Sequence, residues 1–519
     1  MGFKITYATM SADNEEMAVS YGKGIETARS WMGQEYPFYV NGEARLREET
    51  LDERSPIDSE ILIGKFSLAT AKDAQDAVSA AKAASHEWSG KPWRERVEIL
   101  NRAADIISER VYELAALTAL EVGKNQLEAL GEVEEAADLI RYYCHQMDDH
   151  DGFAVPMQQL SDEEHNRSVL RPYGVWAVIS PFNFPSALSA GPAGGALVAG
   201  NTVVLKPSEQ GFLMALKLYD VFMDAGVPPG AFHVLTGLGE TVGHELVGNP
   251  EVDGLTFTGS YDVGMSIYKS VAQDYPKPVI CEMGGKNPAI VSAKADLDKA
   301  TDGVLRSAFG YSGQKCSACS RVLVQREVFD DFVDLLKQKT EKTSVGNPLE
   351  AGVYMGPVID DKAVERFEKA SVEATKEGRV IAGGKRITDG DMERGNFVAP
   401  TVVEVPRDSR IWKEELFVPF VAVSPVDSVD EALKDANDTP FGLTAGFYSE
   451  DKSEVDQFLA SIQAGVVYVN RRAGATTGAW PGVQPFGGWK GSGSSGKAGG
   501  GLYYVQLYMR EQSQTVVEG

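Results

Sequence analysis

Short runs of β-branched and apolar residues alternate with helical stretches along residues 175–285. In chain order the runs are VWAVIS, TVVLKP, AFHVLTG, GLTFTGS and PVICEMGG. Between them lie stretches such as FLMALKLYDVFMDAG, which have the apolar spacing of helices. Because parallel strands need a long crossover between them, usually a helix, this alternation predicts a doubly wound parallel sheet.

The same rhythm resumes after Cys316, in runs that include RVLVQ, GRVIAGG, FVAPTVVEV, PFVAVSPV and AGVVYVN. Residues 70–84, 94–122 and 127–144 instead have helical periodicity, so the first quarter of the chain is expected to be rich in helices. A chain of 519 residues exceeds the size at which a single core keeps growing. We therefore expect an α/β protein with two α/β domains.

The C-terminal region breaks the rhythm. The stretch GGWKGSGSSGKAGGG (487–501) reads on its own as a flexible linker. The segment LYYVQLYMREQSQTVV follows and alternates like an edge strand, which needs a partner. A strand that pairs with a neighbouring subunit would meet that need, so we expect a homo-oligomer.

Charge and cysteine content exclude several classes of protein. The formal net charge of −25 disfavours nucleic acid and anionic membrane surfaces, since both are bound by basic patches. No window approaches 18 uninterrupted apolar residues, and the N-terminus lacks the pattern of a signal peptide. Four cysteines in this length make no disulfide framework. The prediction is a cytoplasmic protein without a membrane span.

Two of the four cysteines, Cys316 and Cys319, lie in FGYSGQKCSACSRVLV. A zinc site would need further paired ligands, which the sequence does not offer. A redox pair and two buried structural cysteines stay open as alternatives, beside a single nucleophile with a bystander. The histidines, cysteine and aspartates of YYCHQMDDHDG (142–152) are read as a polar turn that closes a helix, with a metal site as the alternative.

Polar residues stand at the ends of two predicted strands. Glu282 ends PVICE directly before a Gly–Gly turn, and ligands bind at such strand ends in α/β sheets. A partly buried carboxylate there can act as a general base. Asn183 lies in a proline-stiffened loop, where its amide could donate to an oxyanion or simply cap the next helix.

Three segments suggest a nucleotide. LTGLGETVG has a GxGxxxG pattern, one residue longer than the dinucleotide fingerprint. GLTFTGS precedes a helix whose N-terminus could face a pyrophosphate. Lys206 and Glu209 follow another strand, and a glutamate beside the ribose would repel a 2′-phosphate and so favour NAD over NADP.

Taken together, the motifs PFNFP, KPSE, FTGS, EMGGK, GQKCSACSR, EELFVP and PFGG resemble the aldehyde dehydrogenase superfamily, in family order from about residue 35 to the C-terminus. The resemblance implies a modified Rossmann cofactor domain (1–146 and 167–281) and an α/β catalytic domain (282–486). It also implies a β-strand oligomerisation arm built from the bridging elements 147–166 and 487–519. By position, Cys316 would be the nucleophile, Glu282 the base, and Asn183 with the Cys316 N–H the oxyanion hole. No metal is implied.

The same resemblance implies NAD as cofactor and a set of residues that contact it. They are Ile179, Ser180, Pro181, Phe182, Lys206, Ser208, Glu209, Gly239, Gly243, Phe257, Gly259, Ser260, Gly284, Glu415 and Phe417.

Within the superfamily, Ser317 and the stretch TTGAWPGVQPFGG look most like the 1-pyrroline-5-carboxylate dehydrogenases, which oxidise L-glutamate γ-semialdehyde. In that branch Ser317, Gly478 and Ala479 would hold the substrate carboxylate, because glycine-turn N–H groups form an anion nest. Phe184 and Phe486 would line its aliphatic chain. The alternatives are another semialdehyde dehydrogenase, for succinic or aminoadipic semialdehyde, and an inactive scaffold of the same fold. A separate proline dehydrogenase would be the possible supplier of substrate.

Overall fold

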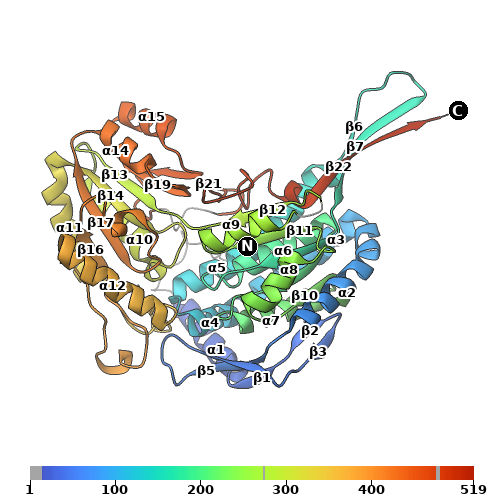
Figure 1. The fold of residues 1–519 in the computed structure, drawn as a ribbon, viewed down its shortest axis with the longest axis horizontal. Helices are drawn as coiled ribbons and strands as arrows, with labels where there is room; N and C mark the ends of the chain where they lie inside the picture. Colours follow the sequence, from blue (N-terminus) through green and yellow to red (C-terminus); the bar gives the residue numbers. More distant parts are fainter. Residues whose placement is uncertain (1–14, 273–274, 475–479, 519) are drawn as a thin grey trace.

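The computed structural model describes residues 15–272, 275–474 and 480–518. Within these ranges, seven strands form a first sheet that lies at the centre of one half of the molecule (Figure 1). In sheet order they are β12 (Val279–Glu282), β11 (Gly254–Thr258), β8 (Val175–Ile179), β9 (Thr202–Lys206), β10 (Phe232–Val234), β2 (Phe38–Val40) and β3 (Glu43–Arg45). β12 to β10 are parallel, so the predicted parallel sheet is confirmed, and β2 and β3 extend it through antiparallel pairs.

Both faces of this sheet are buried. On β8, Trp176 and Val178 pack into the core on one face, and Val175 and Ala177 pack into the core on the other. Strands buried on both faces read as continuous apolar runs, which explains the form of the VWAVI segment.

Helices from separate parts of the sequence cover the two faces. On the first face lie α1 (Glu15–Trp31), α3 (Trp93–Glu109), α4 (Val111–Val122), α5 (Gln126–Asp149), α6 (Ala187–Ala199) and α7 (Phe212–Asp224). On the second lie α2 (Ala71–Gly90), α8 (His244–Gly248) and α9 (Tyr261–Ser270). The predicted helical stretch 94–122 is therefore two helices, which part at Arg110.

A second sheet forms the other half and confirms the second α/β domain (Figure 1). Its strands are β15 (Arg379–Ala382), β16 (Thr401–Glu404), β17 (Phe420–Val426), β14 (Cys319–Gln325), β13 (Asn287–Val291), β19 (Thr444–Tyr448) and β20 (Val466–Val469). Its helices are α10 (Leu297–Phe309), α11 (Phe329–Glu341), α12 (Asp361–Glu377), α13 (Arg410–Lys413), α14 (Val429–Asn437) and α15 (Lys452–Ser461). Smaller sheets join β1 (Gln34–Tyr36), β5 (Leu62–Ser67) and β4 (Thr50–Arg54), and β18 (Phe441–Gly442) with β21 (Trp489–Lys490).

An arm of three strands projects from the body (Figure 1). It consists of β6 (Ala154–Pro156), β7 (Glu164–Pro172) and β22 (Met509–Val517). The expected C-terminal strand is shorter than predicted, because Val505–Tyr508 form a 3₁₀ turn whose Val505 and Tyr508 side chains are buried against the first core. The strand was expected to need a neighbouring subunit as its partner. One of its edges does not, since β7 of the same chain pairs with it along its whole length.

The glycine-rich segment is packed against β12 and is not a linker. Ser494 donates its backbone N–H to the Cys281 carbonyl over 3.0 Å, and its hydroxyl donates to the Val279 carbonyl over 2.8 Å. Ser492 is fully buried and donates to the Gly284 carbonyl over 2.7 Å. The small residues let this segment approach the strand that ends in Glu282. No helix in the described part of the chain is long and apolar enough to cross a membrane.

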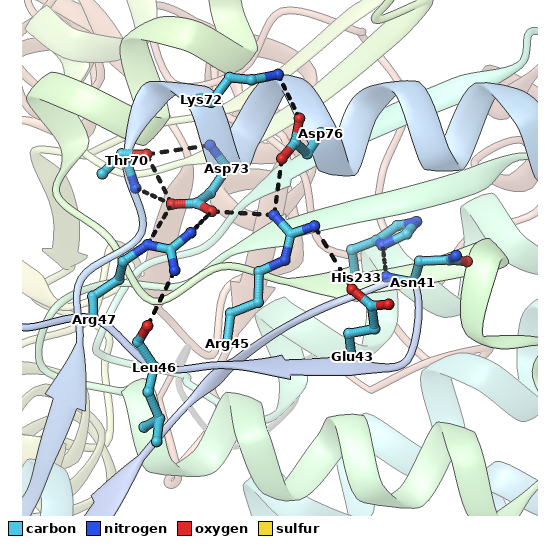
Figure 2. Close-up of polar contacts among 10 residues, drawn as sticks. All are labelled: Asn41, Glu43, Arg45, Leu46, Arg47, Thr70, Lys72, Asp73, Asp76 and His233. Carbon is cyan, nitrogen blue, oxygen red and sulfur yellow. Dashed lines mark hydrogen bonds and ion pairs between the residues drawn. The ribbon is translucent and has the colours of Figure 1, made fainter.

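A buried carboxylate ties the N-terminal strands to α2 (Figure 2). Asp73 is 1% exposed and accepts hydrogen bonds from the Thr70 N–H (3.0 Å) and hydroxyl (2.8 Å), so it forms a capping box. Arg45 and Arg47, from β3 and the turn after it, both pair with this carboxylate. Burial opposes the charged form, but the bonds from Thr70 and Arg47 outweigh it and lower the pKa of Asp73.

We expect Asp73→Asn to lower the Tm at pH 7, because it removes the buried carboxylate that the partly exposed Arg45 and Arg47 share, and hydrogen bonds to a charged group typically contribute ~1.5–3 kcal/mol. Asp76, one turn further on, is 34% exposed and pairs with Arg45 and Lys72. Asp76→Asn is the matched control and should cost under about 1 kcal/mol. Since a lowered pKa contributes stability that is lost as the carboxyl protonates, the Asp73→Asn deficit should shrink below about pH 4. Equal Tm losses in both variants at pH 7 would contradict this assignment.

Candidate active site

A cavity of about 1340 Å³ lies at the carboxyl ends of the parallel strands of the first sheet and reaches residues of the second. Cys316, Glu282 and Asn183 all line it. So does every residue that was predicted to contact the cofactor: Ile179, Ser180, Pro181, Phe182, Lys206, Ser208, Glu209, Gly239, Gly243, Phe257, Gly259, Ser260, Gly284, Glu415 and Phe417. The segments that follow the five parallel strands β8 to β12 meet here because the ends of parallel strands share one edge of a sheet.

One region of the cavity has the donors and acceptors that a dinucleotide needs. Helix α9 begins directly after Ser260 without a side-chain cap, so its first N–H groups are available to an anion beside the cavity. The Glu209 carboxylate accepts from Lys206 Nζ over 2.9 Å and from the Gly239 N–H over 3.0 Å. A Cβ at Gly259 would come within 2.5 Å of the Phe257 ring, so glycine is required at this strand end. The residues present fit a pyrophosphate with adjoining ribose hydroxyls.

The backbone that leads to Cys316 is held in an unusual conformation. Tyr311, Ser312 and Gly313 have φ values of +46°, +54° and +68°, in the left-handed region. This conformation costs side-chain-bearing residues about 1–3 kcal/mol each, so the surroundings must enforce it. The Tyr311 N–H donates to the Glu128 carboxylate over 2.8 Å. The turn fixes where the thiol projects.

The surroundings of Cys316 favour the protonated form of its thiol. Burial is the main cause that raises its pKa to about 12, and the nearby Glu415 and Glu282 carboxylates add to the effect. The backbone N–H groups of Ser317 and of Cys316 itself act in the opposite direction. A base must therefore take the proton when the sulfur reacts.

Asn183 is fixed on both sides. Its backbone carbonyl accepts from Lys124 Nζ over 2.8 Å, and its side-chain Nδ2 donates to the Gln314 carbonyl over 3.0 Å. Gln314 lies two residues before Cys316, so the amide is tied to the loop that carries the thiol. An asparagine amide has two N–H groups, and the second can serve an oxygen bound at Cys316.

Glu282 ends β12 and has the properties of a poised base. Burial raises its pKa to about 8, and a backbone hydrogen bond at Gly488 lowers it only in part. Its Oε2 atom is buried without a hydrogen-bond partner among the residues that the structure describes. A buried carboxylate oxygen that lacks a partner is costly, which suits an atom that binds a reacting water.

Glu415 and Phe417 line the cavity from the second sheet. Glu415 Oε1 accepts from the Gly285 N–H over 2.9 Å, and burial raises the pKa of this carboxyl to about 7. Phe417 has a φ of +54°, and its ring meets that of Phe182 edge to face at 6.0 Å. These residues form part of the wall that the second sheet contributes to the cavity.

The structure reveals a buried ion pair beneath the site that the sequence reasoning missed. Lys124 is fully buried, pairs with Glu132, and has its Nζ 3.6 Å from the centre of the Phe184 ring and 4.6 Å from that of Tyr311. Glu132 also accepts from the Ser186 N–H and hydroxyl, each over 2.8 Å, at the start of α6. The pair thus joins the Asn183 loop to the turn before Cys316.

A second pair, Lys315 with Glu128, lies beside the first. Lys315 directly precedes the nucleophile candidate and is 4% exposed. Two features of the sequence could have indicated these pairs. Charged residues occupy apolar positions in the helical pattern of α5, and a lysine directly precedes Cys316.

The predicted substrate residues are distributed unevenly. Phe486 lines the cavity. The Phe184 ring covers Lys124, and Ser317 is buried with its carbonyl bonded to the Thr444 hydroxyl over 3.1 Å, so neither lines the cavity in the described chain. Gly478 and Ala479 lie outside the described residues. The carboxylate clamp stays a prediction.

The other cysteine and histidine candidates have structural surroundings. Cys319 is buried at the start of β14, with its Sγ 3.6 Å from the Arg321 carbonyl, and it carries a free thiol, as does Cys316. His150 follows α5 and its Nδ1 lies 2.9 Å from the Gln146 carbonyl. Across the described ranges, no three His, Cys, Asp or Glu side chains gather as a metal site.

Comparison with known proteins gives matches over nearly the whole chain. The model of the aldehyde dehydrogenase family matches residues 43–514. A 1-pyrroline-5-carboxylate dehydrogenase of Bacillus cytotoxicus is 38% identical over 506 residues, which cover 96% of each protein. The structure of 1-pyrroline-5-carboxylate dehydrogenase from Thermus with bound NAD is similar with a TM-score of 0.93, at 35% identity and 98% coverage of both chains. Proline utilization A from Bdellovibrio bacteriovorus matches 96% of this chain with 52% of its own, with a TM-score of 0.91 at 36% identity.

We expect Glu132→Leu to lower the Tm more than Lys124→Met. The first change leaves a buried ammonium and the α6 donors without their acceptor, a loss of ~3–5 kcal/mol for an uncompensated buried charge. The second leaves Glu132 its bonds to Ser186. Thermal unfolding followed by circular dichroism measures both, with Lys91→Met as the control, since Lys91 forms only a surface pair with Glu95. A Glu132→Leu protein as stable as the Lys91→Met control would show that the pair does not support the site.

Proposed function

The chain belongs to the aldehyde dehydrogenase family, and from that premise we propose that it oxidises L-glutamate γ-semialdehyde to L-glutamate with NAD, in proline degradation. The observation that carries the proposal is a single cavity that joins a dinucleotide region to Cys316, Glu282 and Asn183. The names of the relatives, at 38% and 35% identity over nearly their full length, support this substrate.

Each of the three residues has one role in the proposed reaction. The Cys316 Sγ forms a bond to the aldehyde carbon while its proton passes to a water molecule in the cavity, because burial favours the protonated thiol beforehand. The aldehyde oxygen becomes an alkoxide that the Asn183 amide and the Cys316 N–H hold. NAD, which the α9 N-terminus, Lys206, Glu209 and Glu415 would hold, would supply the two-electron oxidant by accepting the hydride that leaves the former aldehyde carbon as the thioester forms.

Hydrolysis of the resulting Cys316 thioester is assigned to Glu282. Its carboxylate takes a proton from water, the water oxygen bonds to the acyl carbon, and the carbon–sulfur bond breaks to release the acid and restore the thiol. A pKa of about 8 makes Glu282 a stronger base than an exposed glutamate once it is deprotonated. A dehydrogenase that passes its acyl group to a large thiol cofactor would not need this base.

Two other functions are compatible with the fold. A dehydrogenase for succinic or aminoadipic semialdehyde would use the same three residues with a different carboxylate clamp. A catalytically inactive scaffold would not need a thiol, a poised base and an amide around one cavity. The proposed enzyme is distinguished from both by its substrate.

The proposal extends to assembly, location and supply of substrate. β22 lies at the edge of the arm sheet, so the proposed homo-oligomer can form where a neighbouring chain pairs with or covers that edge. The four cysteines carry free thiols, in keeping with a reducing cytoplasm. A proline dehydrogenase is the proposed source of substrate, and the similarity of this chain to 52% of proline utilization A supports this proposal.

We expect purified protein to form NADH rapidly from 1-pyrroline-5-carboxylate, which opens to the semialdehyde, and slowly from succinic semialdehyde and propanal. Cys316→Ala should abolish all three reactions, because no other group can form the thioester. Absorbance at 340 nm measures them, and Cys319→Ala is the matched control that should stay active. A preference for succinic semialdehyde would keep the mechanism and discard the substrate, and no NADH from any of the three would favour the scaffold.

We expect Glu282→Gln to form about one NADH per active site and then to turn over ~10²–10⁴-fold more slowly, since hydrolysis of the thioester is the step assigned to Glu282. In the wild-type protein the pKa of about 8 means that Glu282 is protonated, and inactive as a base, at lower pH. The steady-state rate of the wild-type protein should therefore rise with pH and level off above about pH 8. Stopped-flow absorbance at 340 nm across this range checks both. A glutamine variant with unchanged turnover would refute the assignment.

A further inference from the structure

Trp480 lines the same cavity as the catalytic residues, together with one face of helix α5. Glu135, Leu139 and Tyr143 on that helix also line the cavity and are spaced four residues apart, so they form a single stripe. Gln484 and Phe486, in the segment that begins with Trp480, complete this wall.

This wall adjoins the catalytic carboxylate. The rings of Tyr143 and Tyr504 stack at 5.8 Å, and both line the cavity. Burial is the main reason that the pKa values of these two tyrosines lie well above the usual range, and the nearby Glu282 carboxylate adds to it. Asp138 lies five residues before Tyr143, about 7.5 Å along the helix axis at 1.5 Å per residue. A substrate with its aldehyde at Cys316 and its tail along α5 therefore extends toward Trp480.

The Trp480 indole is fixed in place from behind the wall. Its Nε1–H donates to Asp138 Oδ2 over 2.8 Å, while Asp138 Oδ1 accepts from Arg141 over 3.2 Å. Arg141 in turn donates to the Asp105 carboxylate and the Ser108 hydroxyl of α3, each over 3.0 Å. Asp138 is 8% exposed, so this charge-assisted bond is largely shielded from water.

The main chain beside the indole is also constrained. Backbone bonds between Trp480 and Gln484 run in both directions, at 3.2 and 3.1 Å, and close a tight turn. The Gln484 side chain accepts from Arg471 over 2.8 Å and donates to the Val467 carbonyl over 2.9 Å, at the second sheet. Moving the ring breaks its bond to Asp138, and moving the main chain that carries it disturbs the bonds of Gln484 to the second sheet.

We propose that Trp480 is a specificity-determining residue that limits the length of the substrate chain, and that Asp138 is the positioning residue that holds its indole. The inference rests on the proposed function only in that the substrate is an aldehyde with a distal carboxylate. A fixed aromatic wall excludes each added methylene, and one methylene in an apolar site changes kcat/KM by about 10–200-fold.

The test compares ω-oxo acids of increasing length, namely succinic semialdehyde, 5-oxopentanoate and 6-oxohexanoate, with L-glutamate γ-semialdehyde beside them. In Trp480→Val we expect the kcat/KM ratio of 6-oxohexanoate to 5-oxopentanoate to rise at least about tenfold. Asp138→Leu should move the ratio in the same direction, and Asp138→Asn, whose oxygen still accepts from the indole, should restore it. Val483→Ala is the control, because Val483 is 76% exposed in the same turn and does not line the cavity.

An unchanged ratio in Trp480→Val and Asp138→Leu, with all substrates slowed equally, would overturn the proposal. Should Trp480→Val fail to fold, Trp480→Phe removes the bond to Asp138 and keeps most of the volume, and it must still raise the ratio. Binding of the product dicarboxylates succinate, glutarate and adipate to the Cys316→Ala protein with NAD, followed by calorimetry, gives the same comparison without turnover. If the wild-type protein oxidised the ω-oxo acids but not L-glutamate γ-semialdehyde, the proposed substrate would be wrong. The kcat/KM ratio of the ω-oxo acids could still be measured and would still test the role of Trp480.

Discussion

The buried pair of Lys124 and Glu132 connects the parts of the active site that lie far apart in sequence. A fully buried ammonium is expensive, and burial lowers the pKa of Lys124 from its usual value, although Glu132 opposes this. The cost is offset because every face of the ammonium has a partner: a carboxylate, the Asn183 carbonyl and two aromatic rings. An apolar residue of similar size could fill the space, but it could not hold the Asn183 carbonyl. The pair therefore serves geometry more than stability.

This geometry explains how a strained turn can hold Cys316 in place. Three successive residues with positive φ have no reason to stay in that conformation in isolation. Glu128 accepts the Tyr311 N–H, and the Tyr311 hydroxyl donates to the Val122 carbonyl over 2.9 Å, so α4 and α5 hold the turn in place. The same helices contribute Lys124 and Glu132. One rigid support thus fixes the thiol, the amide and the α6 N-terminus relative to one another, as efficient catalysis requires.

Much of the fold and of the cofactor region could be predicted because parallel sheets impose a simple rule. Strands buried on both faces read as apolar runs, and the residues that follow them meet at one edge, so Lys206, Ser260 and Glu282 could be placed at strand ends from the sequence, and all three line one cavity. The C-terminal segment was misread because alternation alone does not distinguish a strand from a turn that buries Val505 and Tyr508. Pairing of β22 with β7 joins residues more than 300 positions apart, which no local pattern encodes.

The contacts that were missed share a different cause. Glu132 and Asp138 lie within α5, and Lys124 lies two residues before it. Helical periodicity shows which face of such a helix is covered but not which neighbouring element covers it. A charged residue at such a position is usually exposed, and only the partner on another element shows otherwise. Chemistry common to the family resides at strand ends, where sequence motifs are readable. In our proposal, side chains such as Trp480 select one substrate over another. The position of such a side chain depends on the helix that holds it, here α5 through Asp138. For this reason a sequence can give the reaction of such an enzyme before it gives the length of its substrate.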